Sequence, residues 1–236
     1  MKILGIIPAR GGSKRAPGKN IRVLGGKPLI CWTIDAVKKV GDLCEVIVST
    51  DSQEIADLSN RCGIFVPKLR PKELASDHAT TVDVLRYEVE RYESISGKVD
   101  SILVLQPTSP FRSVATIESA IKLHKTSGHK NIVSVSPSRV SPGWMISVTV
   151  GGYIKPYFGK GALGLRSQDS PISFVPNGCI YLLSRKNLFR QMSLYNKKTL
   201  PLLMESNFEA IDIDEEIDFK LAELLIENGK LLCSNF

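Results

Sequence analysis

Ile3-Leu4-Gly5-Ile6-Ile7 runs directly into Pro8-Ala9-Arg10-Gly11-Gly12-Ser13-Lys14-Arg15-Ala16-Pro17-Gly18-Lys19-Asn20. The first run is short and apolar, which is typical of a buried strand in a parallel sheet. The second run is glycine-rich and basic. Adjacent glycines let backbone N–H groups approach an oxyanion, and the cations neutralise its charge. This stretch therefore predicts an α/β protein that binds phosphates just after its first strand.

The loop differs from the two common phosphate-binding motifs. It lacks the G-x-x-x-x-G-K-[ST] spacing of a P-loop and the G-x-G-x-x-G spacing of a dinucleotide site. Between Met1 and Ile34 there is no Asp or Glu, while the cations of the loop and its surroundings are Arg10, Lys14, Arg15, Lys19, Arg22 and Lys27. So many cations in one turn indicate a triphosphate ligand.

Composition restricts the class of protein. The chain has 236 residues, 43% of them hydrophobic and 23% charged, with a net charge of +7. These values fit one large α/β domain. The excess positive charge is concentrated near the N-terminus, so we expect a small polyanionic ligand and no nucleic-acid partner. No apolar run reaches the ~18–20 residues of a membrane span, and the N-terminus lacks signal-peptide features, so we expect no membrane partner and a cytoplasmic protein.

The cysteines give no metal motif. They are odd in number, lack C-x-x-C spacing and lie mostly in apolar segments: Cys31, Cys44, Cys62, Cys179 and Cys233. We expect reduced core residues.

Predicted strands and helices alternate along the chain. After the first strand we expect strands at 45–50, 64–67, 101–105, 131–135, 179–183 and 209–213. We expect helices at 29–40, 53–62, 80–92, 114–125 and 214–229. This alternation predicts a mostly parallel sheet with helices on both faces. The pattern breaks over residues 137–175, which are rich in Pro and Gly and contain a hairpin signal at Gly151-Gly152. We interpret this part as a β-rich arm inserted into a single domain, serving as a lid, a dimerisation arm or both.

Asp212 and Asp214 flank Ile213 near the end of the last predicted strand. Residues two apart on a strand share a face, so both carboxylates would point the same way. Two carboxylates facing bound phosphates make a Mg²⁺ site, because this ion prefers hard oxygen ligands. Asp214 also has the position of a helix cap.

Polar residues follow other predicted strands, where an open parallel sheet binds its ligands. Gln106 follows a buried strand, and its amide both donates and accepts, which suits a sugar hydroxyl or acylamino group. Arg166 in the arm would pair with a substrate carboxylate, or be a solvated charge. Asn177 begins a possible turn, and Tyr181 by itself suggests a core residue. Arg70 would face a base or a phosphate.

Seven motifs occur in one order across nearly the whole chain. They are Ile7-Pro8-Ala9-Arg10-Gly11-Gly12-Ser13-Lys14, Lys19-Asn20, Ser49-Thr50-Asp51, Arg70-Pro71 through Leu74-Ala75-Ser76-Asp77, Leu105-Gln106-Pro107-Thr108-Ser109-Pro110, Asn177-Gly178 and Ile211-Asp212-Ile213-Asp214. Together they resemble the N-acylneuraminate cytidylyltransferase family, which includes the legionaminic and pseudaminic acid enzymes. The resemblance implies a three-layer Rossmann-like nucleotidyltransferase fold, a homodimer joined by the arm, and transfer of CMP from CTP to a nine-carbon 2-keto sugar acid.

The resemblance also implies a role for each site residue. The residues expected to grip CTP are Arg10, Gly12, Ser13, Lys14, Lys19 and Asn20, with Arg70, Asp77 and Thr81 near the cytidine. The residues expected around the sugar acid are Gln106, Arg166, Asn177 and Tyr181. Asp212 and Asp214 would hold Mg²⁺. Arg10, Lys14, Lys19 and Asp212 would act in catalysis.

Alternatives remain at this point. The resemblance weakens around the sugar, because the neuraminate enzymes carry paired aromatics where this chain has Phe189 and, separately, Tyr195. One alternative is a cytidylyltransferase for the eight-carbon keto sugar acid of lipopolysaccharide, whose sequence starts similarly. Another is a related enzyme of similar fold that uses another nucleotide. A nucleotide-sensing or RNA-binding module would need neither Asp212 nor Asp214.

Overall fold

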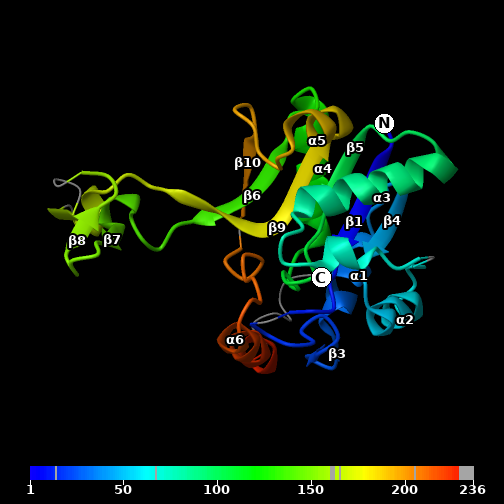
Figure 1. Cartoon of the computed structure of the whole chain (residues 1–236), viewed down its shortest axis with the longest axis horizontal. Helices are drawn as coiled ribbons and strands as arrows, with labels where there is room; N and C mark the ends of the chain where they lie inside the picture. The colour runs from blue at the N-terminus through cyan, green and yellow to red at the C-terminus, as the bar shows by residue number, and fades with distance from the viewer. Residues whose placement is uncertain (14, 67, 160–162, 165, 205, 229–236) are drawn as a thin grey trace.

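The computed structural model describes residues 1–13, 15–66, 68–159, 163–164, 166–204 and 206–228. Its centre is a six-stranded sheet of order β10-β6-β9-β5-β1-β4 (Figure 1). The strands are β1 (Ile3–Pro8), β4 (Glu45–Ser49), β5 (Ser101–Val104), β6 (Ile132–Pro137), β9 (Phe174–Ser184) and β10 (Leu200–Leu203). Only β9 runs antiparallel to its neighbours in this sheet, so the prediction of a mostly parallel sheet is confirmed.

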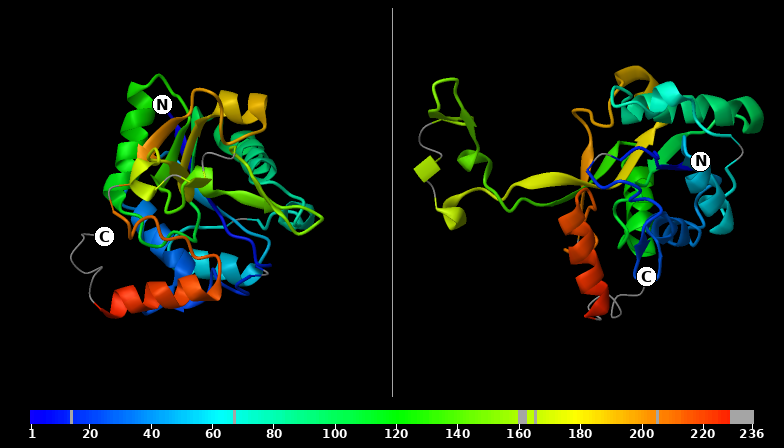
Figure 2. Two further views of the ribbon diagram at one scale, coloured as in Figure 1. Left: turned by 90° about the vertical axis from the view of Figure 1, so that its left-hand side faces the viewer. Right: turned by 60° about the horizontal axis from the view of Figure 1, so that its bottom comes forward.

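Helices cover both faces of the sheet (Figures 1 and 2). One face packs against α1 (Leu29–Val37), α2 (Gln53–Arg61) and α4 (Val114–Thr126) through a large apolar cluster. The other face packs against α3 (Thr81–Ser96) and α5 (Arg185–Gln191) through a second cluster. The three-layer architecture is therefore as predicted. Among the described helices, none has the length and apolar character needed to cross a membrane.

A third, smaller core brings the C-terminal part of the chain to the N-terminal loop. Helix α6 (Glu216–Glu227) contributes Phe219, which packs with Leu24 and Ile213. Leu24 belongs to a short hairpin of β2 (Val23–Leu24) and β3 (Lys27–Pro28). Because Ile213 is buried here, its flanking aspartates lie beside the basic loop that follows β1.

Two predicted strands are absent from the described structure. Residues 209–213 form a turn and an irregular segment, and the edge strand next to β6 is β10 instead. The segment makes one strand-like contact, from the Ile213 N–H to the Thr108 carbonyl at 2.7 Å. Strand formation is disfavoured where aspartates alternate with apolar residues. Residues 64–66 are also irregular, because the Ile64 and Val66 N–H groups donate to Ser59 and Asn60.

The arm extends from the outer ends of two long strands. β6 and β9 still pair at Pro137 and Phe174, and the chain between them projects away from the sheet (Figures 1 and 2). It carries a hairpin of β7 (Ile146–Val148) and β8 (Ile154–Pro156), closed by the Thr149 N–H donating to the Tyr153 carbonyl at 2.9 Å. The hairpin loop between Thr149 and Tyr153 is thus longer than the two-residue turn that Gly151-Gly152 predicted. Short 3₁₀ turns lie in and outside the arm, at Lys72–Ala75, Pro142–Trp144 and Ser167–Asp169.

The expectation of reduced cysteines is wrong for one pair. Cys31 on α1 and Cys62 after α2 are joined by a disulfide. They are 31 positions apart, and a sequence without C-x-x-C spacing gives no sign of such a pair. Cys44 and Cys179 are free, whereas Cys233 lies outside the described residues.

Candidate active site

A hollow of about 330 Å³ lies at the carboxyl ends of β1 and β5. It brings together eight of the residues predicted from the sequence: Arg10, Lys19, Asn20, Arg70, Asp77, Thr81, Gln106 and Asp214. An adjoining hollow of about 290 Å³ adds Ser13 and Arg15. Gly12 is exposed in the same loop, with no atom within 4 Å of the place where a Cβ would lie. Lys14 lies outside the described residues.

Two side chains form hydrogen bonds with the backbone of the basic loop. The Gly11 N–H donates to the Asp51 carboxylate at 2.9 Å, directly after β4. The Asn20 side-chain amide donates to the Arg10 carbonyl at 3.1 Å. These two bonds fix the backbone near the start of the loop and tie it to Asn20 at the other end.

Lys19 joins the loop to the segment between β10 and α6. Its ammonium donates to the Ile213 carbonyl and to the Asp214 carboxylate, each at 3.0 Å. Arg15 adds a second ion pair with Asp214, also at 3.0 Å. Partial burial raises the pKa of the Asp214 carboxyl, but Lys19 and Arg15 outweigh this effect, so its pKa lies below the usual value. Asp214 is therefore an ionised carboxylate among cations.

Asp212 has the opposite environment. Its Oδ1 atom is buried and has no hydrogen-bond partner. Burial raises the pKa of the Asp212 carboxyl above its usual value, and the nearby Asp214 charge raises it further. A buried carboxylate oxygen without a partner is costly. Such an oxygen beside a second carboxylate suits a divalent cation.

The carboxylates of Asp212 and Asp214 fit Mg²⁺ better than they fit a metal ion whose ligands all come from the protein. Within the described part of the chain, no cluster of three or more His, Cys, Asp or Glu side chains is arranged to hold an ion. Mg²⁺ typically takes one or two carboxylates and completes its shell with water and substrate phosphates. Asp212 and Asp214 are two carboxylates that would suit this role, and the basic loop opposite is suited to the phosphates.

Arg70 and Arg10 form the opposite wall. Arg70 is buried, its Nη2 lies 3.9 Å from the Asp51 carboxylate, and its Nε has no partner. Burial lowers the pKa of Arg70, and the Asp51 charge partly offsets this. Arg10 pairs with Asp77 at 3.1 Å, and Thr81 begins α3 nearby. A buried guanidinium with a free N–H offers a hydrogen bond to a ligand.

Gln106 lies where β5 and β9 diverge. A Cβ atom at Gly178, whose φ is +77°, would lie 3.0 Å from Oε1 of Gln106 and 3.5 Å from Oδ2 of Asp212. The glycine thus leaves room for these two side chains to converge. Asn177 beside it accepts a bond from Ser134 at 2.6 Å and donates to Ser136 at 2.7 Å. Its side chain therefore holds β9 in place.

Three predicted acceptor residues lie outside the hollows: Asn177, Tyr181 and Arg166. Tyr181 is largely buried in the sheet core, with its ring 6.0 Å from that of Tyr195. Burial raises the pKa of the Tyr181 hydroxyl, and the neighbouring Tyr195 hydroxyl adds a smaller rise. Arg166 is exposed in the arm, where its carbonyl accepts bonds from Asp169 and Ser170, and it lines neither hollow.

Sequence reasoning did not identify several supporting residues. It placed Arg15 in the loop without its partner Asp214, and it gave Asp51 no role in holding Gly11. Ser134, which fixes Asn177, gives no signal at all because it lies within an ordinary strand. Only a residue directly after a strand carries a sequence signal for this site.

Comparison with known proteins agrees with this geometry. Residues 4–214 match the family model described as Cytidylyltransferase. The chain belongs to the cytidylyltransferase family. It is 42% identical over 228 residues to the CMP-N,N'-diacetyllegionaminic acid synthase of Legionella pneumophila, covering 96% of this chain and 97% of that one. It is 34% identical to the N-acylneuraminate cytidylyltransferase of Streptococcus agalactiae, covering 93% of this chain and 52% of that enzyme.

A solved structure confirms the cytidylyltransferase fold independently. The CMP:2-keto-3-deoxy-manno-octonic acid synthetase complexed with CTP superposes with a TM-score of 0.69, covering 97% of this chain and 99% of that chain. At 18% sequence identity this likeness concerns the fold alone. The nucleotidyltransferase fold expected from the sequence is thus confirmed, and the chain is an enzyme of the nucleotidyltransferase class.

Proposed function

We propose that this cytidylyltransferase transfers CMP from CTP to the anomeric hydroxyl of a nine-carbon 2-keto sugar acid and releases pyrophosphate. One observation carries the proposal most strongly: a cationic loop after β1 and the ionised Asp214 line one hollow, and Asp212, whose pKa is raised, lies two positions from Asp214. The names of the two relatives describe enzymes that act on acids of this kind. The 42% identity to the Legionella enzyme favours an acceptor of the diacetyllegionaminic acid type.

The nucleotide half of the site uses the basic loop. Arg10, Ser13, Lys14, Lys19 and Asn20 bind the phosphates of CTP, with Gly12 giving the backbone room to approach. On the far wall, Arg70, Asp77 and Thr81 lie near the cytidine. The sugar hydroxyl attacks the α-phosphorus in line, so catalysis rests on alignment and on stabilising the developing charge by Arg10, Lys14 and Lys19.

The acceptor half lies around Gln106, Asn177 and Tyr181. Gln106 presents an amide that bonds to hydroxyl or acylamino groups. Asp212 and Asp214 would hold Mg²⁺, which supplies charge neutralisation at the phosphates. The unpartnered Oδ1 of Asp212 supports this assignment.

The arm makes the enzyme a homodimer in this proposal. Its exposed apolar side chains include Val148 (70%) and Ile154 (63%), which a second copy would cover. Arg166 would then reach the acceptor of the partner's site and pair with its carboxylate. We place the enzyme in the cytoplasm, where CTP is available, and assign its product to surface-glycan or glycoprotein synthesis.

A panel of acceptors tests the proposal. Pyrophosphate release is measured with CTP and Mg²⁺ and one of four acids: N-acetylneuraminic, N,N'-diacetyllegionaminic, pseudaminic, or the eight-carbon keto sugar acid. We expect rapid release with one nine-carbon acid, and fastest with the legionaminic compound. Preference for the eight-carbon acid would favour the lipopolysaccharide alternative, and release with none of the four would overturn the proposed acceptor class.

A further inference from the structure

Arg112 is a fully buried cation without a carboxylate partner. It is 1% exposed, and no ion pair to it is found among the described residues. Its guanidinium instead donates to three neutral oxygens: Nε to the Cys179 carbonyl at 2.9 Å, Nη2 to the Gln106 carbonyl at 2.8 Å, and Nη1 to the Thr33 hydroxyl at 3.2 Å. Burying such a charge is costly, so the contacts it makes deserve a functional account.

The Cys179 carbonyl belongs to β9, and the Gln106 carbonyl lies two residues beyond the end of β5. The β5–β9 ladder ends at the pair Val104–Tyr181. Continuing this register by two residues would pair Gln106 with Cys179. The ladder does not continue there, because the Cys179 N–H donates to the Asn177 side chain at 3.2 Å. Arg112 therefore takes the place of a backbone bridge where the strands separate.

This separation makes room for the acceptor half of the site. The Gln106 side chain lies so close to Gly178 that a Cβ there would come within 3.0 Å of its Oε1, and Arg112 holds the carbonyls of Gln106 and of Cys179, the residue after Gly178. The planar guanidinium group normally binds the two oxygens of a carboxylate; here it joins a carbonyl of β9 to one in the segment that follows β5. A Lys ammonium cannot reproduce this geometry.

We propose that Arg112 is a positioning residue that sets the width of the acceptor pocket by fixing Gln106 against Gly178. The inference rests on the proposed function, which assigns Gln106 to the acceptor. Arg112 itself lines neither hollow, and it reaches the site only through the Gln106 and Cys179 carbonyls. Its loss should therefore affect binding of the sugar acid and leave binding of CTP intact.

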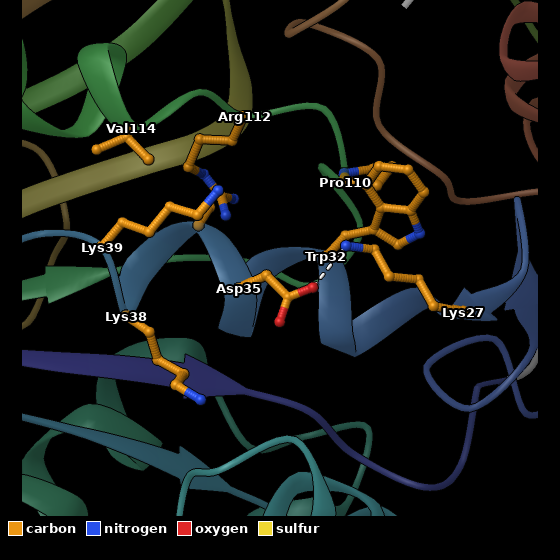
Figure 3. A pocket seen from close by; sticks show the side chains of 9 residues that line it. Lys27, Trp32, Asp35, Lys38, Lys39, Pro110, Arg112 and Val114 are labelled. Atoms are coloured by element: carbon orange, nitrogen blue, oxygen red, sulfur yellow. Dashed lines mark hydrogen bonds and ion pairs between the residues drawn. The ribbon is translucent and has the colours of Figure 1, made fainter. Parts of the chain in front are cut away.

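On the side of α1, the buried Arg112 side chain borders a second pocket. Arg112 lines a separate pocket of about 500 Å³ beside α1, whose walls include Trp32, Lys39 and Pro110 (Figure 3). Truncation of Arg112 to Ala would leave a guanidinium-sized space open to this pocket. Free guanidinium can then enter and restore the lost contacts.

The test compares Arg112→Lys and Arg112→Ala with Thr33→Val, which removes only the third contact. We expect both Arg112 variants to raise the KM for the sugar acid at least tenfold, with the KM for CTP within twofold of wild type. Thr33→Val should lower the melting temperature and change neither KM. Guanidinium chloride at 50 mM should recover the acceptor KM of Arg112→Ala at least fivefold, whereas potassium chloride should not.

Several results would overturn the inference. They are an unchanged acceptor KM in folded Arg112→Lys, equal rises of both KM values, the same KM change in Thr33→Val, and no rescue by guanidinium. Failure of both Arg112 variants to fold would make Arg112 a folding residue only. An inactive wild-type enzyme would instead overturn the proposed function, and this inference with it.

Discussion

The ammonium of Lys19 lies 3.0 Å from the carboxylate of Asp214, across 195 positions of sequence. This bond ties the loop after β1 to the segment before α6, and the Ile213 carbonyl accepts from the same ammonium. Lys19 thus has two tasks in the proposed mechanism. It holds the carboxylate of a metal site, and it presents positive charge to the phosphates.

Replacing Lys19 by Ala should therefore impair the chemical step strongly. We expect kcat/KM for CTP to fall about 10²–10³-fold, the usual loss when one preorganised donor to developing charge is removed. Lys27→Ala is the matched control, because Lys27 also pairs with a carboxylate, that of Asp35, outside both hollows. Steady-state pyrophosphate release gives both values. Equal losses in the two variants would show that Lys19 has no specific role.

Gly178 gives a second prediction. Ala at this position would strain a backbone with φ +77° and press a Cβ against Gln106. We expect the KM for the sugar acid to rise at least tenfold. Gly97→Ala is the control, because its φ is +80° but no atom lies within 4 Å of the added Cβ. The two variants should lose similar stability, by roughly 1 kcal/mol, while only Gly178→Ala loses acceptor affinity. Similar kinetics for both would count against the proposed acceptor site.

Asp212 links the metal site to stability. Its pKa is raised in the folded state, so the folded protein binds the proton of this carboxyl more tightly than the unfolded chain does. As the pH rises past the usual pKa of an aspartate, ionisation then costs folded-state stability. Asp212→Asn removes this cost.

At pH 7 without Mg²⁺, we expect Asp212→Asn to melt roughly 2–4 °C above wild type, the shift for about 1 kcal/mol in a domain of this size. The difference should vanish below the usual aspartate pKa. Addition of Mg²⁺ and CTP should stabilise wild type more than the variant, and the variant should not turn over. Calorimetry across pH measures this, and a variant less stable than wild type at pH 7 would contradict the raised pKa.

The arm gives a prediction about assembly. Val148→Glu and Ile154→Glu introduce charges on the exposed apolar face of the arm hairpin. We expect both variants to sediment as monomers and to lose activity, because Arg166 would no longer reach a partner's site. Ile95→Glu on α3 is the control, since Ile95 is 81% exposed but lies outside the arm. A wild-type monomer with full activity would overturn the dimer proposal.

The sequence predicts the fold well where patterns are local and strong. The apolar run of β1 and the helical segments predicted at 53–62 and 80–92 mark elements that the structure confirms. It fails at residues 209–213, where alternating Asp and Ile mimic a strand but one backbone bond to Thr108 and the burial of Ile213 decide the conformation. The edge strand β10 contains a proline, Pro201, and sequence reasoning missed it.

The candidate site was predictable for a related reason. Residues directly after parallel strands meet at one edge of the sheet, so Arg10 and Gln106 could be placed together from the sequence. The disulfide between Cys31 and Cys62, the support of Asn177 by Ser134 and the contacts of Arg112 could not. Each depends on which residues the folded chain brings together, and no local pattern encodes that.

The most direct test of the account is pyrophosphate release with N,N'-diacetyllegionaminic acid, offered with CTP, UTP, GTP or ATP, with and without EDTA. The account predicts that, of the four nucleotides, only CTP gives rapid pyrophosphate release with the sugar acid. It also predicts that chelation of Mg²⁺ abolishes this release, and that Asp212→Asn releases no pyrophosphate under any condition. Release that persists in EDTA, or that proceeds equally well in Asp212→Asn, would contradict the central claim that the hollow beside Lys19 and Asp214 is a metal-dependent CTP site.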